Sequence, residues 1–200
     1  MEGVRQGPRY ALVVRLPREV EVRIEDAFLG LLSTSKPTIG YHITLLGPFL
    51  LLVDDLDACV ARIVQVCYHT RPFSVRVGGL GAFKESDDNA VFLDVLENDR
   101  VVRLHRRLVR ATQEDIRPQY AWSRGPGPQP FRPHITLGLG LTDRELQTFL
   151  RTSDDGAVDE AFGICELSLV EQRPGEPWHY VNAFPLAAQV GGPAEGGKTA

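Results

Sequence analysis

Cysteine is scarce in this sequence, and long apolar runs are absent from it. The three cysteines, Cys59, Cys67 and Cys165, lack the paired spacing of a disulfide framework. Cys59 and Cys67 fall on one predicted helix, separated by a rise of about 12 Å, which is too far to bridge. No stretch approaches the roughly 20 apolar residues of a membrane-spanning helix, and the N-terminus has no charged-then-apolar signal pattern. We therefore expect a protein of the reducing cytoplasm with no membrane partner.

Positive charge is not in excess either. The 200 residues include 22 lysines and arginines against 26 aspartates and glutamates, which gives a formal net charge of −4. This balance excludes a protein that coats nucleic acid through bulk charge, but it permits a local basic surface. The length suits a single domain with a sizeable core, which we place at residues 1–186. Small, glycine-rich residues at 187–200 predict a disordered C-terminal tail.

Apolar residues recur along the chain with two different periods. Strand-like runs occur at residues 10–17, 38–49, 73–83, 89–96, 134–141, 164–172 and 178–186. Helical spacing occurs between residues 20 and 32, 56 and 67, 101 and 109, and 146 and 150, the last behind a capping-box pattern of Thr142 and Glu145. The order β-α-β-α-β-β-α-β-α-β-β, with its short strand-to-strand connections, predicts an α+β fold of antiparallel sheets flanked by helices.

A short polar pattern interrupts two of the predicted strands. "GYHITLLGPF", residues 40–49, and "FRPHITLGLG", residues 131–140, each set a histidine and a threonine two positions apart. Alternate side chains of a strand share a face, so His42 projects with Thr44, and His134 projects with Thr136. If the two strands face each other across a cleft, two imidazoles and two hydroxyls converge there.

Such a set suits phosphate-ester chemistry without a metal or other cofactor. A neutral imidazole can remove a proton, an imidazolium can donate one, and hydroxyl groups can bind phosphate oxygens. Two alternatives exist for the histidines. Each could be a polar residue satisfied within a sheet, or both could be zinc ligands, although no spacing here completes the three or four ligands that zinc needs.

With these motifs the sequence resembles the 2H phosphoesterase superfamily, most closely its 2′-5′ RNA ligase and RNA 2′,3′-cyclic phosphodiesterase branch. The resemblance covers about residues 8 to 186 and rests on "YHITLLGPF", "FRPHITLG", "VGGLGAF" and "WHYVNAFPL". It implies a bilobal fold of two antiparallel sheets with a pseudo-two-fold axis and a central cleft. It also implies that His42 and His134 are catalytic, that Thr44 and Thr136 bind phosphate, and that no metal takes part.

The expected reaction is the opening of 2′,3′-cyclic phosphates, on RNA ends or nucleotides, to 2′-phosphates. In our first assignment His134 is the base and His42 the acid, and the reverse direction would be 2′-5′ RNA ligation. The partner is thus an RNA end or a cyclic nucleotide in RNA processing, and we expect a monomer with no obligatory protein partner. Two alternatives stay open at this point: a nucleoside-monophosphate-binding module without significant turnover, and a cyclic phosphodiesterase of small metabolites.

Further residues near the motifs are predicted to bind substrate. Phe49 and Phe83 could stack on a base, with a core position as the alternative. Trp122, in the proline- and glycine-rich loop 117–130, could form a lid or anchor that loop. Arg132 could contact phosphate if the strand begins early enough.

For two other polar features, we favour a structural role over a functional one. His105 falls on the apolar stripe of its predicted helix, which is typical of a satisfied core histidine. The same helix carries five arginines, which predict a solvated face more strongly than a track for an RNA backbone. These are Arg100, Arg103, Arg106, Arg107 and Arg110.

Overall fold

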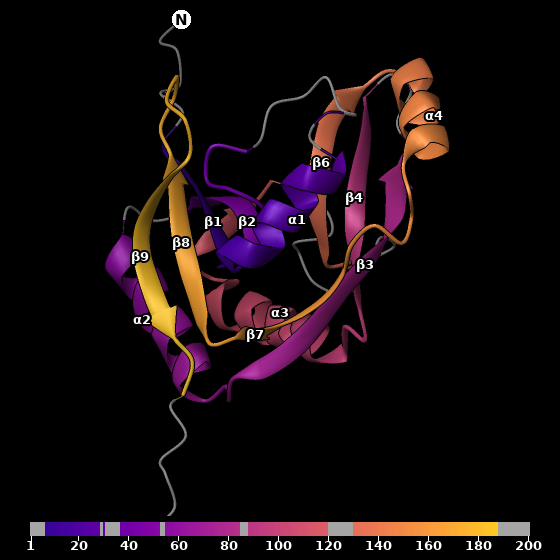
Figure 1. Ribbon diagram of the computed structural model, residues 1–200. Coiled ribbons are helices and arrows are strands. Elements are labelled where there is room, and N and C mark those ends of the chain that lie inside the picture. The colour runs from indigo at the N-terminus through magenta and orange to yellow at the C-terminus, as the bar shows by residue number, and fades with distance from the viewer. Residues whose placement is uncertain are drawn as a thin grey trace, which may run out of the picture.

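The computed structural model describes residues 7–28, 30, 37–52, 55–84, 88–119 and 130–187. These ranges hold nine strands and four helices (Figure 1). In chain order they are β1 (Arg9–Arg15), α1 (Arg18–Phe28), β2 (His42–Leu51), α2 (Leu56–Tyr68), β3 (Phe73–Phe83), β4 (Asn89–Leu96), α3 (Asp99–Thr112), β5 (Ile116–Pro118), β6 (His134–Leu141), α4 (Asp143–Thr152), β7 (Asp159–Ile164), β8 (Glu166–Gln172) and β9 (His179–Pro185).

The predicted α+β class and order of elements are confirmed, with two strands added. The first addition, β5, has three residues and ends in a proline, so it carries too little periodicity to be recognised. The second, β7, has the sequence DEAFGI and buries only Phe162 and Ile164 among its six residues. Strands with so few buried side chains look like loops to any argument based on hydrophobic periodicity.

One antiparallel sheet contains all of these strands, in the order β7-β3-β4-β6-β2-β1-β8-β9, with β5 paired to β2. Its two four-stranded halves meet where β2 pairs with β6, and the register there is Ile43 opposite Ile135. The prediction of two sheets is therefore wrong, because the two strands that carry the His-x-Thr motifs lie side by side and hydrogen-bond to each other. The bilobal shape and the central cleft stay predictions.

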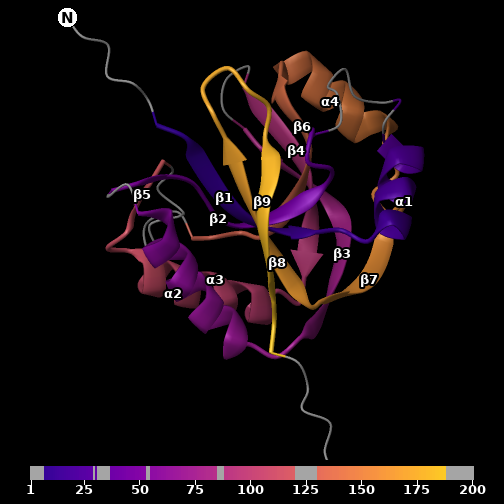
Figure 2. The ribbon, with the colours of Figure 1, turned by 90° about the vertical axis from the view of Figure 1, so that its left-hand side faces the viewer.

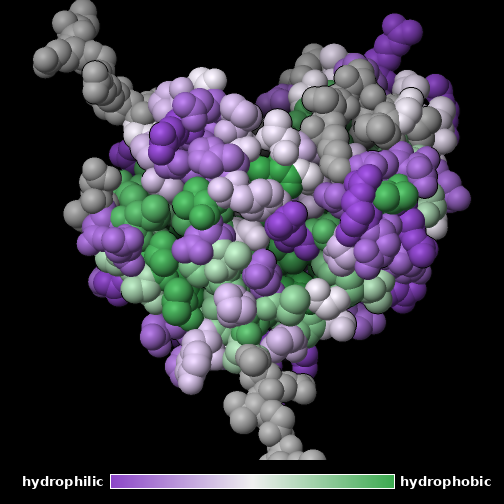
Figure 3. Space-filling model, turned by 60° about the vertical axis from the view of Figure 1, so that its left-hand side comes forward, coloured by the Kyte–Doolittle hydropathy of each residue, from purple (hydrophilic) through white to green (hydrophobic). Residues whose placement is uncertain are grey.

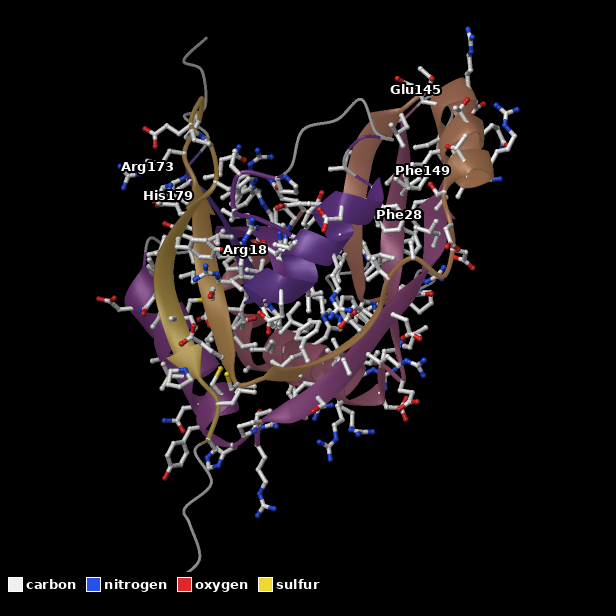
Figure 4. The ribbon with its side chains drawn as sticks, in the orientation of Figure 1. Arg18, Phe28, Glu145, Phe149, Arg173 and His179 are labelled. Carbon is white, nitrogen blue, oxygen red and sulfur yellow. The ribbon has the colours of Figure 1, made fainter. Side chains whose placement is uncertain are left out.

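Each half of the sheet is covered by a helix from the other half's connection. The β1–β2 connection contains α1, yet Phe28 of α1 packs on Phe149 of α4, with ring centroids 5.9 Å apart (Figure 4). Arg23 of α1 also forms an ion pair with Glu160 of β7. Conversely, α3 follows β4 on the way to β6 but packs against α2 and β2. Figure 2 shows the resulting pairs, α1 beside α4 and α2 beside α3.

The main core lies between the sheet and these helices, and it includes the buried Tyr41. His105 is buried too, which confirms the core position predicted for it. The His105 Nδ1 lies 2.7 Å from the Leu45 carbonyl oxygen, and its ring stacks on Phe131 at 3.9 Å. Burial lowers the pKa of His105. The capping box is also present, since the Thr142 and Glu145 side chains each bond the other's backbone N–H.

Apolar side chains also reach the surface in places, as the green patches among hydrophilic residues in Figure 3 show. Exposed examples include Val64 and Tyr68 of α2 and Val181 of β9. None of the helices in the described ranges is both long and apolar enough to span a bilayer. The predicted tail lies outside the described residues except for Ala187, as does Trp122, and the boundaries proposed for the domain stay predictions.

We expect Phe149→Ala to lower the free energy of unfolding by about 3–5 kcal/mol, because the ring is buried between α4 and α1 and truncation leaves a cavity. Urea denaturation of the purified protein measures this loss. The neighbouring Leu150→Ala is the control, because Leu150 is 37% exposed and its truncation should cost much less. Equal losses for the two variants would contradict this packing.

Candidate active site

Both His-x-Thr motifs lie on one face of the sheet, on strands that are neighbours. Ile43 is opposite Ile135 in an antiparallel pair, so each histidine faces the other motif's threonine across the ladder. The two isoleucines are fully buried toward the core, while the histidines and threonines are partly exposed on the opposite side. The four polar residues form what we call the histidine face: His42, Thr44, His134 and Thr136.

The two motifs therefore come together in a different way from the one predicted. Instead of facing each other across a cleft, the two strands are adjacent in one sheet, and directly opposite residues of neighbouring strands are about 4.5–5.5 Å apart. Within the described part of the chain neither Thr44 nor Thr136 has a hydrogen-bond partner for its hydroxyl. Both hydroxyls are thus available to a ligand on this face.

The two imidazoles are oriented in the same way. The Nδ1 of His42 lies 2.9 Å from the Gly40 carbonyl oxygen, and that of His134 lies 2.8 Å from the Arg132 carbonyl oxygen. A carbonyl can only accept, so Nδ1 carries the hydrogen in both rings and donates it. The Nε2 atoms are then the positions where a proton is gained or lost, which is the arrangement that acid–base catalysis requires.

Burial lowers the pKa of His42 below its ordinary value, because the charged imidazolium is poorly solvated. The hydrogen bond to Gly40 opposes this effect, and the positive charge of a protonated His134 adds to it. His42 is therefore neutral over most of the physiological pH range. The contribution of His134 is the smallest of these causes, and it reflects the position of the two rings on neighbouring strands.

Burial is also the main reason that the pKa of His134 is lowered, since Phe83 and Phe92 enclose its ring. Their centroids lie 5.0 Å and 5.1 Å from that of the imidazole. The hydrogen bond to Arg132 and the carboxylate of Asp94 raise this pKa, and the positive charge of Arg132 lowers it by a smaller amount. Asp94 is directly opposite His134 in the β4–β6 pair, so this histidine has an acidic neighbour on its own face.

The "VGGLGAF" segment of β3 makes room for the aromatic ring of Phe92, which packs on His134. A Cβ at Gly81 would collide with the ring of Phe92, which pairs with it across β3 and β4. Only a glycine lets Phe92 lie flat against β3 and pack on both Phe83 and His134.

The predicted substrate-binding residues have different positions. Phe49 is fully buried and stacks on Tyr10, with centroids 5.9 Å apart, so the prediction that it stacks on a base is wrong. Phe83 is 39% exposed beside His134 and stays a prediction for such a role. The strand begins at His134, after Arg132, whose guanidinium binds Asp94 with Nε 3.2 Å from Oδ1. The phosphate contact predicted for Arg132 stays untested.

Sequence reasoning missed Glu21, which supports His42 from α1. Its Oε1 accepts a hydrogen bond from the Tyr41 backbone N–H at 3.0 Å. That N–H and the Gly40 carbonyl belong to the same peptide group, so this group is held by Glu21 on one side and by the His42 Nδ1 on the other. Gly40 has φ +74°, and a Cβ there would collide with the Glu21 carboxylate. The glycine before the motif was the available signal.

The arginine-rich helix has structural partners for part of its charge. Arg107 donates to the Thr70 hydroxyl at 2.9 Å and to the His69 carbonyl at 3.2 Å, so it holds the end of α2. Arg100 lies over the Phe73 ring at 5.9 Å. As for metal ions, the described residues include no group of three or more His, Cys, Asp or Glu arranged to hold one.

Solved structures share this arrangement of strands and helices. E. coli LigT in complex with 3′-AMP has a TM-score of 0.64 at 16% identity, over 92% of this chain and 100% of that chain. TT0787 of Thermus thermophilus has a TM-score of 0.62 at 22% identity, with 90% and 99% covered. Kluyveromyces marxianus Usb1 with uridine monophosphate has a TM-score of 0.53 at 14% identity, over 90% and 99%. The fold thus defines an α+β protein of the LigT class.

The sequence itself narrows this class to a family. The model of the 2′-5′ RNA ligase superfamily matches residues 17–176, a range that includes both His-x-Thr motifs. The chain belongs to the 2′-5′ RNA ligase superfamily, so the resemblance inferred from the motifs is confirmed. A Bacillus licheniformis protein named "Putative phosphoesterase" is 22% identical over 176 residues, which is 88% of this chain and 98% of that protein. A Staphylococcus haemolyticus protein of the same name is 26% identical over 156 residues, or 78% and 86%.

We expect Glu21→Ala to release the Gly40–Tyr41 peptide group and with it the fixed Nδ1–H tautomer of His42. Nitrogen NMR of the imidazoles at about pH 8, where histidines are neutral, measures the tautomer populations. The wild-type protein should show the Nδ1–H form for His42 and His134, and the variant should show a mixture for His42 alone.

Glu25→Ala is the matched control, because Glu25 shares the Arg18 ion pair with Glu21, whereas the Tyr41 backbone N–H donates to Glu21. It should leave both tautomers unchanged. A His42 tautomer in Glu21→Ala that equals that of the wild type would show that Glu21 does not orient the ring.

Proposed function

We propose that this protein opens 2′,3′-cyclic phosphates of RNA ends or nucleotides to 2′-phosphates, without a metal ion. The observation that carries the proposal is the Ile43–Ile135 pair, which sets two imidazoles and two hydroxyls together on one face. Membership of the 2′-5′ RNA ligase superfamily supports it, as do the nucleotides named in the LigT and Usb1 complexes. The related 2′-5′ ligation would use the same groups, with a 5′-hydroxyl in place of water attacking the cyclic phosphate and the 3′-oxygen leaving.

In the proposed reaction water attacks the phosphorus of the cyclic ester. The Nε2 of one neutral histidine takes a proton from the water as the new P–O bond forms. The bond from phosphorus to the 3′-oxygen breaks, and the Nε2–H of the other histidine protonates that oxygen. The hydroxyls of Thr44 and Thr136 donate to the non-bridging oxygens, where charge accumulates in the transition state. The base gains a proton from the water and the acid gives one to the 3′-oxygen. The two histidines therefore hold the same number of protons at the end, but the extra proton has moved to the base.

The surroundings of the two rings favour His42 as the base and His134 as the acid. Asp94 raises the pKa of His134 by more than the charge of Arg132 lowers it, so this ring holds a proton more readily. His42 has no such contribution among the causes of its shift, and a protonated His134 disfavours its charge further. The proposal therefore reverses the assignment made from the sequence, where the two motifs are too alike to distinguish their roles.

We expect His42→Ala and His134→Ala each to lower kcat by about 10²–10⁴, because each removes one proton transfer. The measurement is turnover of a nucleoside 2′,3′-cyclic phosphate at neutral pH with EDTA present, with the product mapped as a 2′- or 3′-phosphate. His179→Ala is the control, since His179 lies on β9 and pairs with Glu171 instead of lining the histidine face.

Three outcomes would contradict the proposal: loss of activity in EDTA, a 3′-phosphate product, or near wild-type turnover by either alanine variant. Tight binding of nucleoside monophosphates by a wild-type protein that turns over no cyclic phosphate would favour a binding module. Cyclic-ended oligoribonucleotides assayed beside mononucleotides would separate an RNA-end enzyme from one for small metabolites.

The pH dependence of kcat/KM should be bell-shaped, with its maximum below about pH 6.5. His42 must lose its proton and His134 must keep one, and burial lowers the pKa of both rings from 6.5. Asp94→Asn removes a group that raises the pKa of His134, so the descending limb should move to lower pH. Asp159→Asn is the control, because its carboxylate pairs with Arg76 at the β3–β7 edge. An unmoved limb in Asp94→Asn would contradict the assignment of the acid.

A further inference from the structure

Arg15 places a cation next to the histidine face. It is the last residue of β1 and is directly opposite His42 in the antiparallel β1–β2 pair. Side chains directly opposite each other on neighbouring strands project from the same face, with Cα atoms about 4.5–5.5 Å apart. Arg15 is exposed, so its guanidinium is accessible from the side on which a ligand of His42 would lie.

The guanidinium of Arg15 is held in place by a ring and not by a carboxylate. Its central carbon lies 4.5 Å from the centroid of the Tyr180 ring, a cation–π contact. Tyr180 is itself fixed, because its hydroxyl donates to the Ile39 carbonyl oxygen at 2.6 Å. No carboxylate in the described part of the chain forms an ion pair with Arg15. Arg15 also has a side-chain hydrogen bond to Tyr180, and the remaining N–H groups of its planar fork suit a bidentate anion such as phosphate.

The equivalent position in the other half has the opposite charge. Asp94 is opposite His134 as Arg15 is opposite His42. The Asp94 carboxylate already binds Arg132, so that side offers no unneutralised cation. A ligand with a second anionic group is therefore favoured in one orientation, with that group on the β1 side of the histidine face.

The side chains that neighbour Arg15 on this face of the sheet are apolar and buried. Val13 is opposite Thr44 and packs with Ala11, Ile39 and Val170 in a small cluster of its own, separate from the main core. This cluster brings no acidic side chain toward the guanidinium. It leads across the sheet to Tyr180, which is 39% exposed.

We propose that Arg15, held by Tyr180, binds a second phosphate group of the substrate, one that lies beyond the cyclic phosphate. The inference rests on the proposed function and names its substrate class. That class is ribose cyclic phosphates that carry a further phosphate on the 5′-oxygen, either as a terminal group or as the link to a preceding nucleotide. Plain nucleosides with a 2′,3′-cyclic phosphate lack the group that Arg15 recognises.

Binding tests the inference without depending on turnover. Calorimetry with adenosine 2′-monophosphate and adenosine 2′,5′-bisphosphate compares two ligands that differ by one phosphate. The wild-type protein should bind the bisphosphate more tightly by about tenfold to a hundredfold, as expected for a charge-assisted hydrogen bond. Arg15→Gln should lose that preference and bind the monophosphate within about twofold of the wild type.

Two further variants sharpen the test. Arg76→Gln, on β3, removes an exposed strand arginine far from the histidine face and should keep the full preference. Tyr180→Leu removes the ring that holds the guanidinium, so this variant should lose part of the preference for the bisphosphate.

Equal affinity of the wild type for both ligands would overturn the inference. So would an equal loss for both ligands in Arg15→Gln, which would place Arg15 on the reacting phosphate instead. Turnover of the corresponding 2′,3′-cyclic phosphates is measured in parallel. A preference that depends on Arg15, found together with no turnover by the wild type, would leave the phosphate site standing and contradict the proposed function alone.

Discussion

The pairing of Ile43 with Ile135 is the contact on which the rest of this site depends. It joins the two halves of the sheet and fixes their register, and it does so with two fully buried side chains. A shift of one residue along either strand would turn its histidine and threonine toward the core and expose its isoleucine. The energetic preference for burying both isoleucines is therefore the same preference that presents two imidazoles and two hydroxyls to a ligand.

A nearly symmetric frame carries an asymmetric set of charges. Four strands of the sheet order lie on each side of the β2–β6 junction, and each half is covered by one helix from the opposite connection. Both histidines bind a backbone carbonyl two residues earlier. Yet the residue opposite His134 is Asp94, and the residue opposite His42 is Arg15. Symmetry thus sets the positions of the groups, while under the proposed function these two neighbours distinguish which ring holds a proton and how a ligand is oriented.

Sequence reasoning succeeded where the information is local. Alternation within each "HIT" triplet identified the face of each side chain, and helical spacing found His105 in the core. It failed where a feature depends on contacts between distant segments. That the two motif strands are neighbours, that Phe49 packs on Tyr10, and that Glu21 supports the peptide before His42 all arise from tertiary packing. Short strands such as β5 bury too few residues to leave a periodic signal.

Because the two histidines are largely buried, their protonation state depends on whether a ligand is bound between them. In the free protein, poor solvation lowers the pKa of both rings, and the charge of a protonated His134 lowers that of His42 further, so a pair of charged imidazoles on adjacent strands is disfavoured. An anionic phosphate bound between them has the opposite effect, because a nearby negative charge stabilises an imidazolium. His134, the ring beside Asp94, gains a proton more readily than His42 does. In the proposed function, binding of a phosphate ester would therefore create the mixed protonation state, one neutral ring and one charged ring, that acid–base chemistry at phosphorus requires.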